Sequence, residues 1–194
     1  MQLKRNIDTI LFDWKKSQSR KPILLRGARQ VGKSTTVKAF AKQFDYFLEV
    51  NFETEKDIHV FFEGNINVVR ICEKLSIYYN TPIEAGKTLL FFDEIQQCIP
   101  AISALRYFYE QLNELHLIAA GSLLEFALAE LPSFGVGRIR SVFMYPLSFY
   151  EFLEAKNETK LIELIKIGKT IDIPFHKKLT DYLRIFIIIG GMPE

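Results

Sequence analysis

A phosphate-binding loop pattern is found at Gly27-Ala28-Arg29-Gln30-Val31-Gly32-Lys33-Ser34: one glycine, four residues, then Gly-Lys-Ser. The apolar run 22–25 precedes this stretch, and residues 35–42 follow it with apolar side chains at helical spacing. The alternative is a glycine-containing turn before an ordinary helix. The order strand, loop, helix favours the phosphate loop, because its chemistry requires that setting.

Each residue type in this loop has its own task in holding a triphosphate. Gly27 and Gly32 lack a Cβ, so the chain can bend and point successive N–H groups at the phosphates. Lys33 can reach the outer phosphates, and the Ser34 hydroxyl can bind the accompanying Mg²⁺. The expected cofactor-binding set is Gly27, Ala28, Arg29, Gln30, Val31, Gly32, Lys33, Ser34 and Thr35.

Length and composition indicate one α/β domain with a sizeable core, since 48% of the 194 residues are hydrophobic. Cys72 and Cys98 stand apart without a Cys/His grouping, which argues against zinc or a disulfide framework and suits the cytoplasm. The longest apolar run, 185–189, falls far short of the ~20 residues that a membrane span needs. We therefore expect a soluble cytoplasmic protein without a membrane partner.

Basic residues are concentrated at the start of the chain. Residues 1–42 hold 11 Lys and Arg against 2 Asp, whereas the net charge of the whole chain is only +2. This region contains the phosphate loop, so part of the excess is expected to serve a polyanionic ligand. The rest is interpreted as solvated helix surface, and a nucleic-acid partner stays open.

A pair of carboxylates follows the apolar run 88–92. Continuous hydrophobicity of this length predicts a parallel strand covered on both faces. Asp93 and Glu94 would then lie at the strand's carboxyl end, where open α/β sheets bind ligands. Asp93 is the candidate Mg²⁺ ligand beside Ser34, and Glu94 the candidate base for the attacking water.

Ser122 follows a further predicted strand, 115–121, and two explanations of it are compatible. With Glu125 it has the spacing of a capping box, which would begin a helix. At a strand end near Asp93 it could also sense the γ-phosphate. The second role makes Ser122 a candidate catalytic residue.

Arg138 follows a predicted surface loop at 131–137. An arginine near transferring phosphates can neutralise developing charge, from the same chain or from a neighbouring subunit. The alternative is a solvated arginine at a loop end, with Arg140 beside it. We retain Arg138 as a candidate catalytic residue.

Helices are expected before and after the predicted sheet. Residues 3–17 have the apolar spacing of an amphipathic helix, in which Trp14 is either a packing anchor or a neighbour of the adenine ring. Residues 55–80 suggest two helices separated near Gly64. The predicted organisation is a core over 1–146 and a helical segment over 147–194, leading to a C-terminal domain that this chain lacks.

Taken together, the motifs resemble a prokaryotic branch of the AAA-superfamily P-loop ATPases. The resemblance implies a three-layer sandwich with a parallel sheet of about five strands in order 5-1-4-3-2. It also implies ATP and Mg²⁺ as cofactors, Ser122 as sensor and Arg138 as the arginine that reads the γ-phosphate. The motifs that carry it lie at 25–34, 90–96, 120–124, 137–138, 146–152 and 190–193.

The leading hypothesis is a Mg²⁺-dependent ATPase that drives a conformational or assembly switch. A GTPase is disfavoured because no Asn-Lys-x-Asp motif occurs, and a kinase because Glu94 beside Asp93 suits water as the acceptor. Two alternatives stay open, a non-hydrolysing ATP-binding regulatory module and a nucleic-acid-stimulated ATPase. A macromolecular partner is expected but not identified, and a homo-oligomer is compatible with the sequence.

Overall fold

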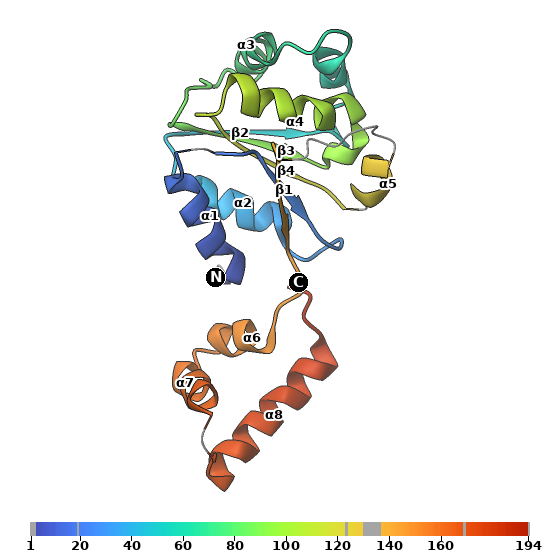
Figure 1. The fold of residues 1–194 in the computed structure, drawn as a ribbon. Helices are drawn as coiled ribbons and strands as arrows, with labels where there is room; N and C mark the ends of the chain where they lie inside the picture. Colours follow the sequence, from blue (N-terminus) through green and yellow to red (C-terminus); the bar gives the residue numbers. More distant parts are fainter. Residues whose placement is uncertain (1–2, 19, 123, 130–136, 169, 194) are drawn as a thin grey trace.

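Continuous apolar strands build a five-stranded parallel sheet at the centre of the computed structural model (Figure 1), which describes residues 3–18, 20–122, 124–129, 137–168 and 170–193. The strand order is β2-β3-β4-β1-β5, so the predicted order 5-1-4-3-2 is confirmed. Every pair of neighbouring strands runs parallel. The strands are β1 (Ile23–Arg26), β2 (Tyr46–Asn51), β3 (Thr88–Asp93), β4 (His116–Ala120) and β5 (Arg140–Phe143).

Helices cover both faces of the sheet and complete three layers. Helices α1 and α2 pack with one face, and α3, α4 and α5 with the other. All six residues of β3 are buried, as expected for a central strand with two covered faces. The core helices are α1 (Asn6–Lys16), α2 (Lys33–Ala41), α3 (Val68–Tyr79), α4 (Ile99–Gln111) and α5 (Leu124–Ala129).

Trp14 is a packing anchor at one edge of the sheet. Its ring is almost fully buried, and its Nε1 donates a hydrogen bond to the Lys21 carbonyl at 2.8 Å. The ring also meets His116 edge to face at a centroid distance of 5.4 Å. Because His116 begins β4, Trp14 lies at the amino edge of the sheet, away from the phosphate loop.

The segment 55–80 differs in part from its prediction. Its second helix is α3, but residues Lys56–Phe62 form a 3₁₀ helix, η1. A helix of seven residues depends on packing rather than on propensity. Here the buried Ile58 and Phe62 secure it against the core. The predicted surface loop at 131–137 lies, except for Gly137, outside the described residues.

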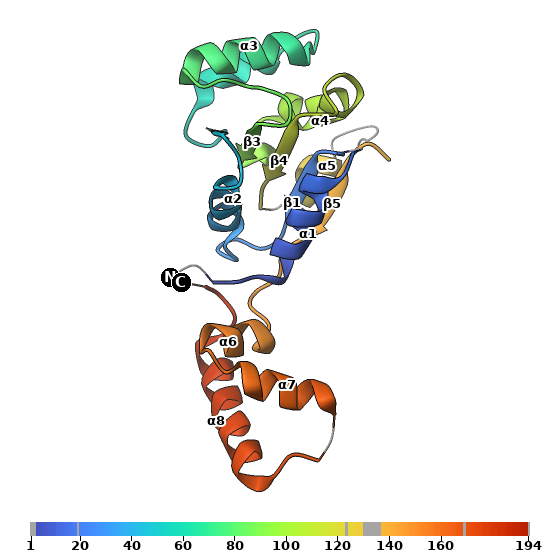
Figure 2. The ribbon, with the colours of Figure 1, turned by 90° about the vertical axis from the view of Figure 1, so that its left-hand side faces the viewer.

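Three helices follow the sheet and form a separate small core (Figure 2): α6 (Phe149–Ala155), α7 (Thr159–Ile167) and α8 (Ile173–Ile189). A capping box begins α6, since the Ser148 hydroxyl accepts from Glu151 N–H and the Glu151 carboxylate accepts from Ser148 N–H. The division of the chain near residue 147 stays a prediction. The residues buried in this small core are Phe152, Leu153, Leu161, Ile162 and Leu179.

None of the described helices combines the length and hydropathy of a membrane span.

Candidate functional site: the phosphate loop and the carboxyl edge of the sheet

The loop between β1 and α2 has the backbone shape of an anion cradle. Gly27, Gln30 and Gly32 all have positive φ, at 144°, 65° and 91°. A Cβ at Gly27 would lie 2.2 Å from the Met144 carbonyl oxygen, so only glycine fits there. Gly32 is the N-cap of α2 without a side-chain cap, which leaves the helix's first N–H groups facing the loop.

The side chain of Lys33 is bound to carbonyl groups of the loop, and it would have to leave them to bind a ligand. Its Nζ donates to the carbonyl oxygens of Gly27 at 2.9 Å and Ala28 at 2.8 Å. Burial lowers the pKa of Lys33, and the nearby carboxylates of Glu94 and Asp93 oppose that shift. Phosphate oxygens carry full charge and would bind this ammonium more strongly than two neutral carbonyls.

Ser34 and Asp93 are brought together as the predicted metal ligands. The Ser34 hydroxyl donates to Asp93 Oδ2 at 2.7 Å, and Asp93 Oδ1 accepts from the Glu94 N–H at 3.1 Å. Burial raises the pKa of Asp93, while these two hydrogen bonds lower it. A hydroxyl and a carboxylate oxygen fit Mg²⁺, which in such sites takes its remaining ligands from water and phosphate. The described residues contain no group of three or more His, Cys, Asp or Glu side chains that could hold a metal alone.

Glu94 faces the same cavity as the phosphate loop. It follows β3 directly in the left-handed conformation, with φ of 49°, and caps the short 3₁₀ helix η2 (Ile95–Gln97). This turn redirects the chain at the carboxyl edge of the sheet. The cavity has a volume of about 250 Å³ and is lined by Arg29, Gln30, Gly32, Lys33, Ser34, Thr35, Glu94 and Pro193.

Ser122 joins this group from the end of β4. Its side chain is buried, and its hydroxyl donates to Glu94 Oε2 at 3.4 Å. The ends of β1, β3 and β4 therefore contribute to one cluster, as expected where parallel strands terminate at a common edge. The side chain of Glu125, the predicted capping partner of Ser122, lies outside the described residues.

Arg138 is not brought to the phosphate loop of its own chain. Arg140 pairs with Ile23, the first residue of β1, so Arg138 lies just before the amino edge of the sheet. The phosphate loop follows the opposite end of β1. Arg138 is half exposed and forms an ion pair with Glu110, close to the end of α4. Its role as a functional arginine, in its own chain or in a neighbouring subunit, stays a prediction.

Comparison with known proteins places this geometry in a family. A family model described as an AAA domain matches residues 19–153. The chain belongs to this family. The matched range of the AAA domain contains the phosphate loop, Asp93, Glu94, Ser122 and Arg138, and the predicted AAA-type P-loop ATPase core is confirmed. A search of curated proteins finds no match.

Solved structures share the fold of the AAA domain at low sequence identity. The Walker-type ATPase PABY2304 of Pyrococcus abyssi has a TM-score of 0.55 and 17% identity, over 99% of this chain and 65% of its own. Drosophila ORC bound to DNA has a TM-score of 0.52 and 14% identity, over 94% of this chain and 56% of its own. The chain thus spans less than two thirds of either structure, and the likeness shows the fold alone.

Arg5 is a residue of the loop's surroundings that the sequence did not reveal. Its guanidinium is almost fully buried and donates to the carbonyls of Val31 at 2.9 Å and Tyr145 at 2.7 Å, and to Glu151 Oε1 at 3.1 Å. Glu151 belongs to the capping box of α6, and the fold brings its carboxylate to Arg5. The phosphate loop of the AAA domain is thereby tied to the start of α6.

The segment 190–193 returns to the phosphate loop. Leu147 N–H donates to the Gly191 carbonyl at 2.6 Å. Pro193 lines the cavity beside Gly32, where its Cγ lies 3.4 Å from the position of an ideal Cβ. The Gly-Gly-Met-Pro motif is therefore part of the surroundings of the candidate site.

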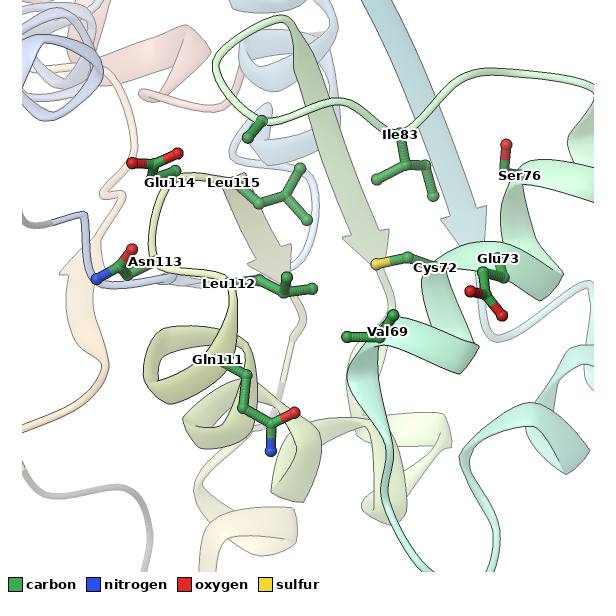
Figure 3. A pocket seen from close by; sticks show the side chains of 11 residues that line it. Val69, Cys72, Glu73, Ser76, Ile83, Gln111, Leu112, Asn113, Glu114 and Leu115 are labelled. Atoms are coloured by element: carbon green, nitrogen blue, oxygen red, sulfur yellow. The ribbon is translucent and has the colours of Figure 1, made fainter.

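A larger cavity, of about 440 Å³, lies at the opposite edge of the sheet (Figure 3). Figure 3 shows it between α3, which contributes Cys72 and Glu73, and the connection to β4, which contributes Glu114. Its described lining includes these two carboxylates but no Lys or Arg, so it is unsuited to phosphate. Burial raises the pKa of Cys72 to about 12, which disfavours a thiolate nucleophile there.

Proposed function

We propose that the protein binds ATP with Mg²⁺ at the phosphate loop and hydrolyses it to ADP and phosphate. Membership of the AAA family indicates ATP binding and hydrolysis in general terms. The observation that carries the finer proposal is the Ser34–Asp93 contact of 2.7 Å, with Glu94 in the same cavity as Lys33. A metal ligand pair, a base and a phosphate-binding lysine then serve one ligand.

In this proposal some residues bind the phosphates and the metal, and others position the attacking water and accept its proton. Loop N–H groups and Lys33 hold the phosphates, and Ser34 and Asp93 hold the metal. A Mg²⁺ ion held there would neutralise phosphate charge and so favour attack by water. Glu94 orients that water and accepts its proton. Ser122, bonded to Glu94, links the base to the presence of the γ-phosphate.

The position of Arg138 supports a proposal about how subunits assemble. Parallel strands give each subunit a phosphate-loop edge and an opposite edge, where Arg138 lies half exposed. Its ion pair with Glu110 is a surface pair, which contributes little stability and can be exchanged for a phosphate. We therefore propose a head-to-tail homo-oligomer in which Arg138 of one subunit reaches the nucleotide of the next.

The test is phosphate release from Mg-ATP by the unmodified chain, by Glu94→Gln and by Lys33→Ala, with nucleotide binding measured for all three. We expect turnover by the unmodified chain, binding without turnover in Glu94→Gln, and loss of binding in Lys33→Ala. Binding without turnover in the unmodified chain would instead support the non-hydrolysing regulatory module. Unchanged binding in Lys33→Ala would overturn the phosphate-loop assignment.

Nucleic-acid stimulation receives less support from the contacts of the basic residues. Among those in residues 1–42, Arg5 is buried, Lys33 lies in the loop, and Lys38 pairs with Glu49 at 3.0 Å. Internal contacts thus account for part of the positive charge. Addition of DNA at two salt concentrations tests this alternative, since a nucleic-acid-dependent rate would fall at higher salt.

A further inference from the structure

The side-chain amide of Gln96 is hydrogen-bonded to the carboxylate of Glu94. It lies in the 3₁₀ turn η2, immediately after β3, and its Nε2 donates to Glu94 Oε2 at 2.6 Å. Ser122 donates to the same oxygen from β4, at 3.4 Å. Within the part of the chain that the structure describes, no donor reaches the other oxygen, Glu94 Oε1. Two donors from neighbouring strand ends therefore hold one oxygen of the carboxylate, while the other has no donor among the described residues.

The amide of Gln96 occupies a space that exists because residue 121 is glycine. A Cβ at Gly121 would lie 2.1 Å from Gln96 Oε1 and 3.2 Å from its Cδ. Gly121 follows β4 directly, between that strand and Ser122. The amide therefore packs between the ends of β3 and β4, in space that a side chain at residue 121 would fill.

This arrangement leaves a polar atom unsatisfied. Gln96 Oε1 is buried and has no hydrogen-bond partner among the described residues. The reversed amide would set an oxygen against the Glu94 carboxylate, and two acceptors repel, so the donor must face Glu94. An unpaired buried carbonyl costs stability. Such a cost is expected where a position serves a site rather than the core.

We propose that Gln96 is a positioning residue for the hydrolytic step, an inference that rests on the proposed ATPase function. Donation to Glu94 Oε2 holds the carboxylate at the cavity with Oε1 free to accept the proton of the attacking water. Gln96 itself exchanges no proton and touches no phosphate. Its effect is therefore on turnover through Glu94, with nucleotide affinity unchanged.

The first test replaces the amide by a side chain of similar length without a donor. Gln96→Met is expected to lower kcat about ten- to hundredfold, a part of what a general base contributes, with the Kd for Mg-ATP unchanged. Gln97→Met is the matched control, because Gln97 is exposed in the same turn, and it should keep the kcat of the unmodified chain. An unchanged kcat in Gln96→Met would overturn the proposal.

A double-mutant cycle separates positioning from a general loss of structure. In a Glu94→Gln background, Gln96→Met should not lower the residual rate further. Equal losses in both backgrounds would assign Gln96 a merely structural role and overturn the proposal. Gly121→Ala provides an independent route, since its Cβ displaces the amide. It should lower kcat as Gln96→Met does, and the Gly121→Ala/Gln96→Met pair should be no slower than either single variant.

A crystal structure of the Gln96→Met chain gives a readout besides turnover. We expect Glu94 Oε2 to move away from Ser122 Oγ once the shorter contact is removed. A carboxylate that stays in place would overturn the proposal. If the unmodified chain binds ATP without turnover, the proposed hydrolysis fails, yet a displaced carboxylate would still support the positioning of Glu94 by Gln96.

Discussion

Ser34 Oγ lies 2.7 Å from Asp93 Oδ2, so the end of the phosphate loop and the end of β3 are in direct contact. This contact joins residues from two motifs that are far apart in the sequence, and it brings their oxygens close enough to share one cation. The sheet order explains it, because β1 and β3 both flank β4 and end at the same edge. The contact yields the first prediction.

Asp93→Asn should raise the Mg²⁺ concentration needed for half-maximal ATP hydrolysis and lower kcat by about a hundredfold, since a neutral amide binds Mg²⁺ weakly. A magnesium titration of phosphate release measures both effects. Asp45→Asn, an exposed carboxylate before β2, is the control and should leave the titration unchanged. An identical magnesium requirement in Asp93→Asn would remove Asp93 from the metal site.

Gly27 should be intolerant of any side chain. Gly27→Ala places a Cβ 2.2 Å from the Met144 carbonyl at φ of 144°, so we expect a loss of about 3 kcal/mol in unfolding free energy and no ATP binding. Gly86→Ala is the matched control. Its φ is 77° with open space around the site, so it should lose only about 1 kcal/mol. Chemical denaturation with nucleotide titration measures both, and equal losses would contradict the close approach.

Arg138 should act between subunits. Arg138→Ala and Lys33→Ala are each expected to be inactive alone, and their mixture should regain part of the activity, because each supplies the group that the other lacks. Arg140→Ala, two residues further along at the start of β5, is the control and should hydrolyse ATP at the normal rate. Phosphate release from the mixture, measured over a range of protein concentrations, decides the matter. A mixture as inactive as its parts would argue against a shared site.

His116 should make the fold sensitive to acid. Burial, followed by the charge of Arg20, lowers the pKa of His116 to about 4, below its usual 6.5. As pH falls from 6.5 to 4, the unfolded chain takes up a proton that the folded chain excludes, so stability is lost. His116→Phe should abolish this loss, which reaches about 3 kcal/mol at about 1.4 kcal/mol per pKa unit. Denaturation at pH 7 and pH 4 measures it, and His176→Phe, at an exposed position, should behave like the unmodified chain.

The sheet, and the placing of the candidate site residues at its edge, could be predicted because local patterns determine both. The apolar run 88–92 indicated a strand with two covered faces, and its position ahead of Asp93 set that carboxylate at the ligand edge. Lys33 and Ser34 followed from the loop pattern. Parallel strands bring their carboxyl ends together, so residues far apart in sequence could be assigned to one cluster without any knowledge of contacts.

Contacts that depend on tertiary packing could not be predicted. The pairing of Arg5 with Glu151 joins residues 146 positions apart, and neither residue type signals the other. The hydrogen bond from Gln96 to Glu94 depends on the space left by Gly121, which follows β4. Arg138 was predicted as a candidate residue, but the edge of the sheet at which it lies became evident only from the register of β5 with β1.

The buried pair of Arg5 and Glu151 also has a consequence for the order of events during protein synthesis. Arg5 leaves the ribosome first, and its carboxylate follows 146 residues later. A guanidinium is not buried unpaired at tolerable cost, so Arg5 stays in water until that carboxylate arrives. The nascent sheet can assemble earlier, but its phosphate loop receives the Arg5 contact at Val31 only afterwards. A nascent chain whose residue 151 has not yet emerged from the ribosome would therefore carry a domain that can form its strands but not the native surroundings of its loop.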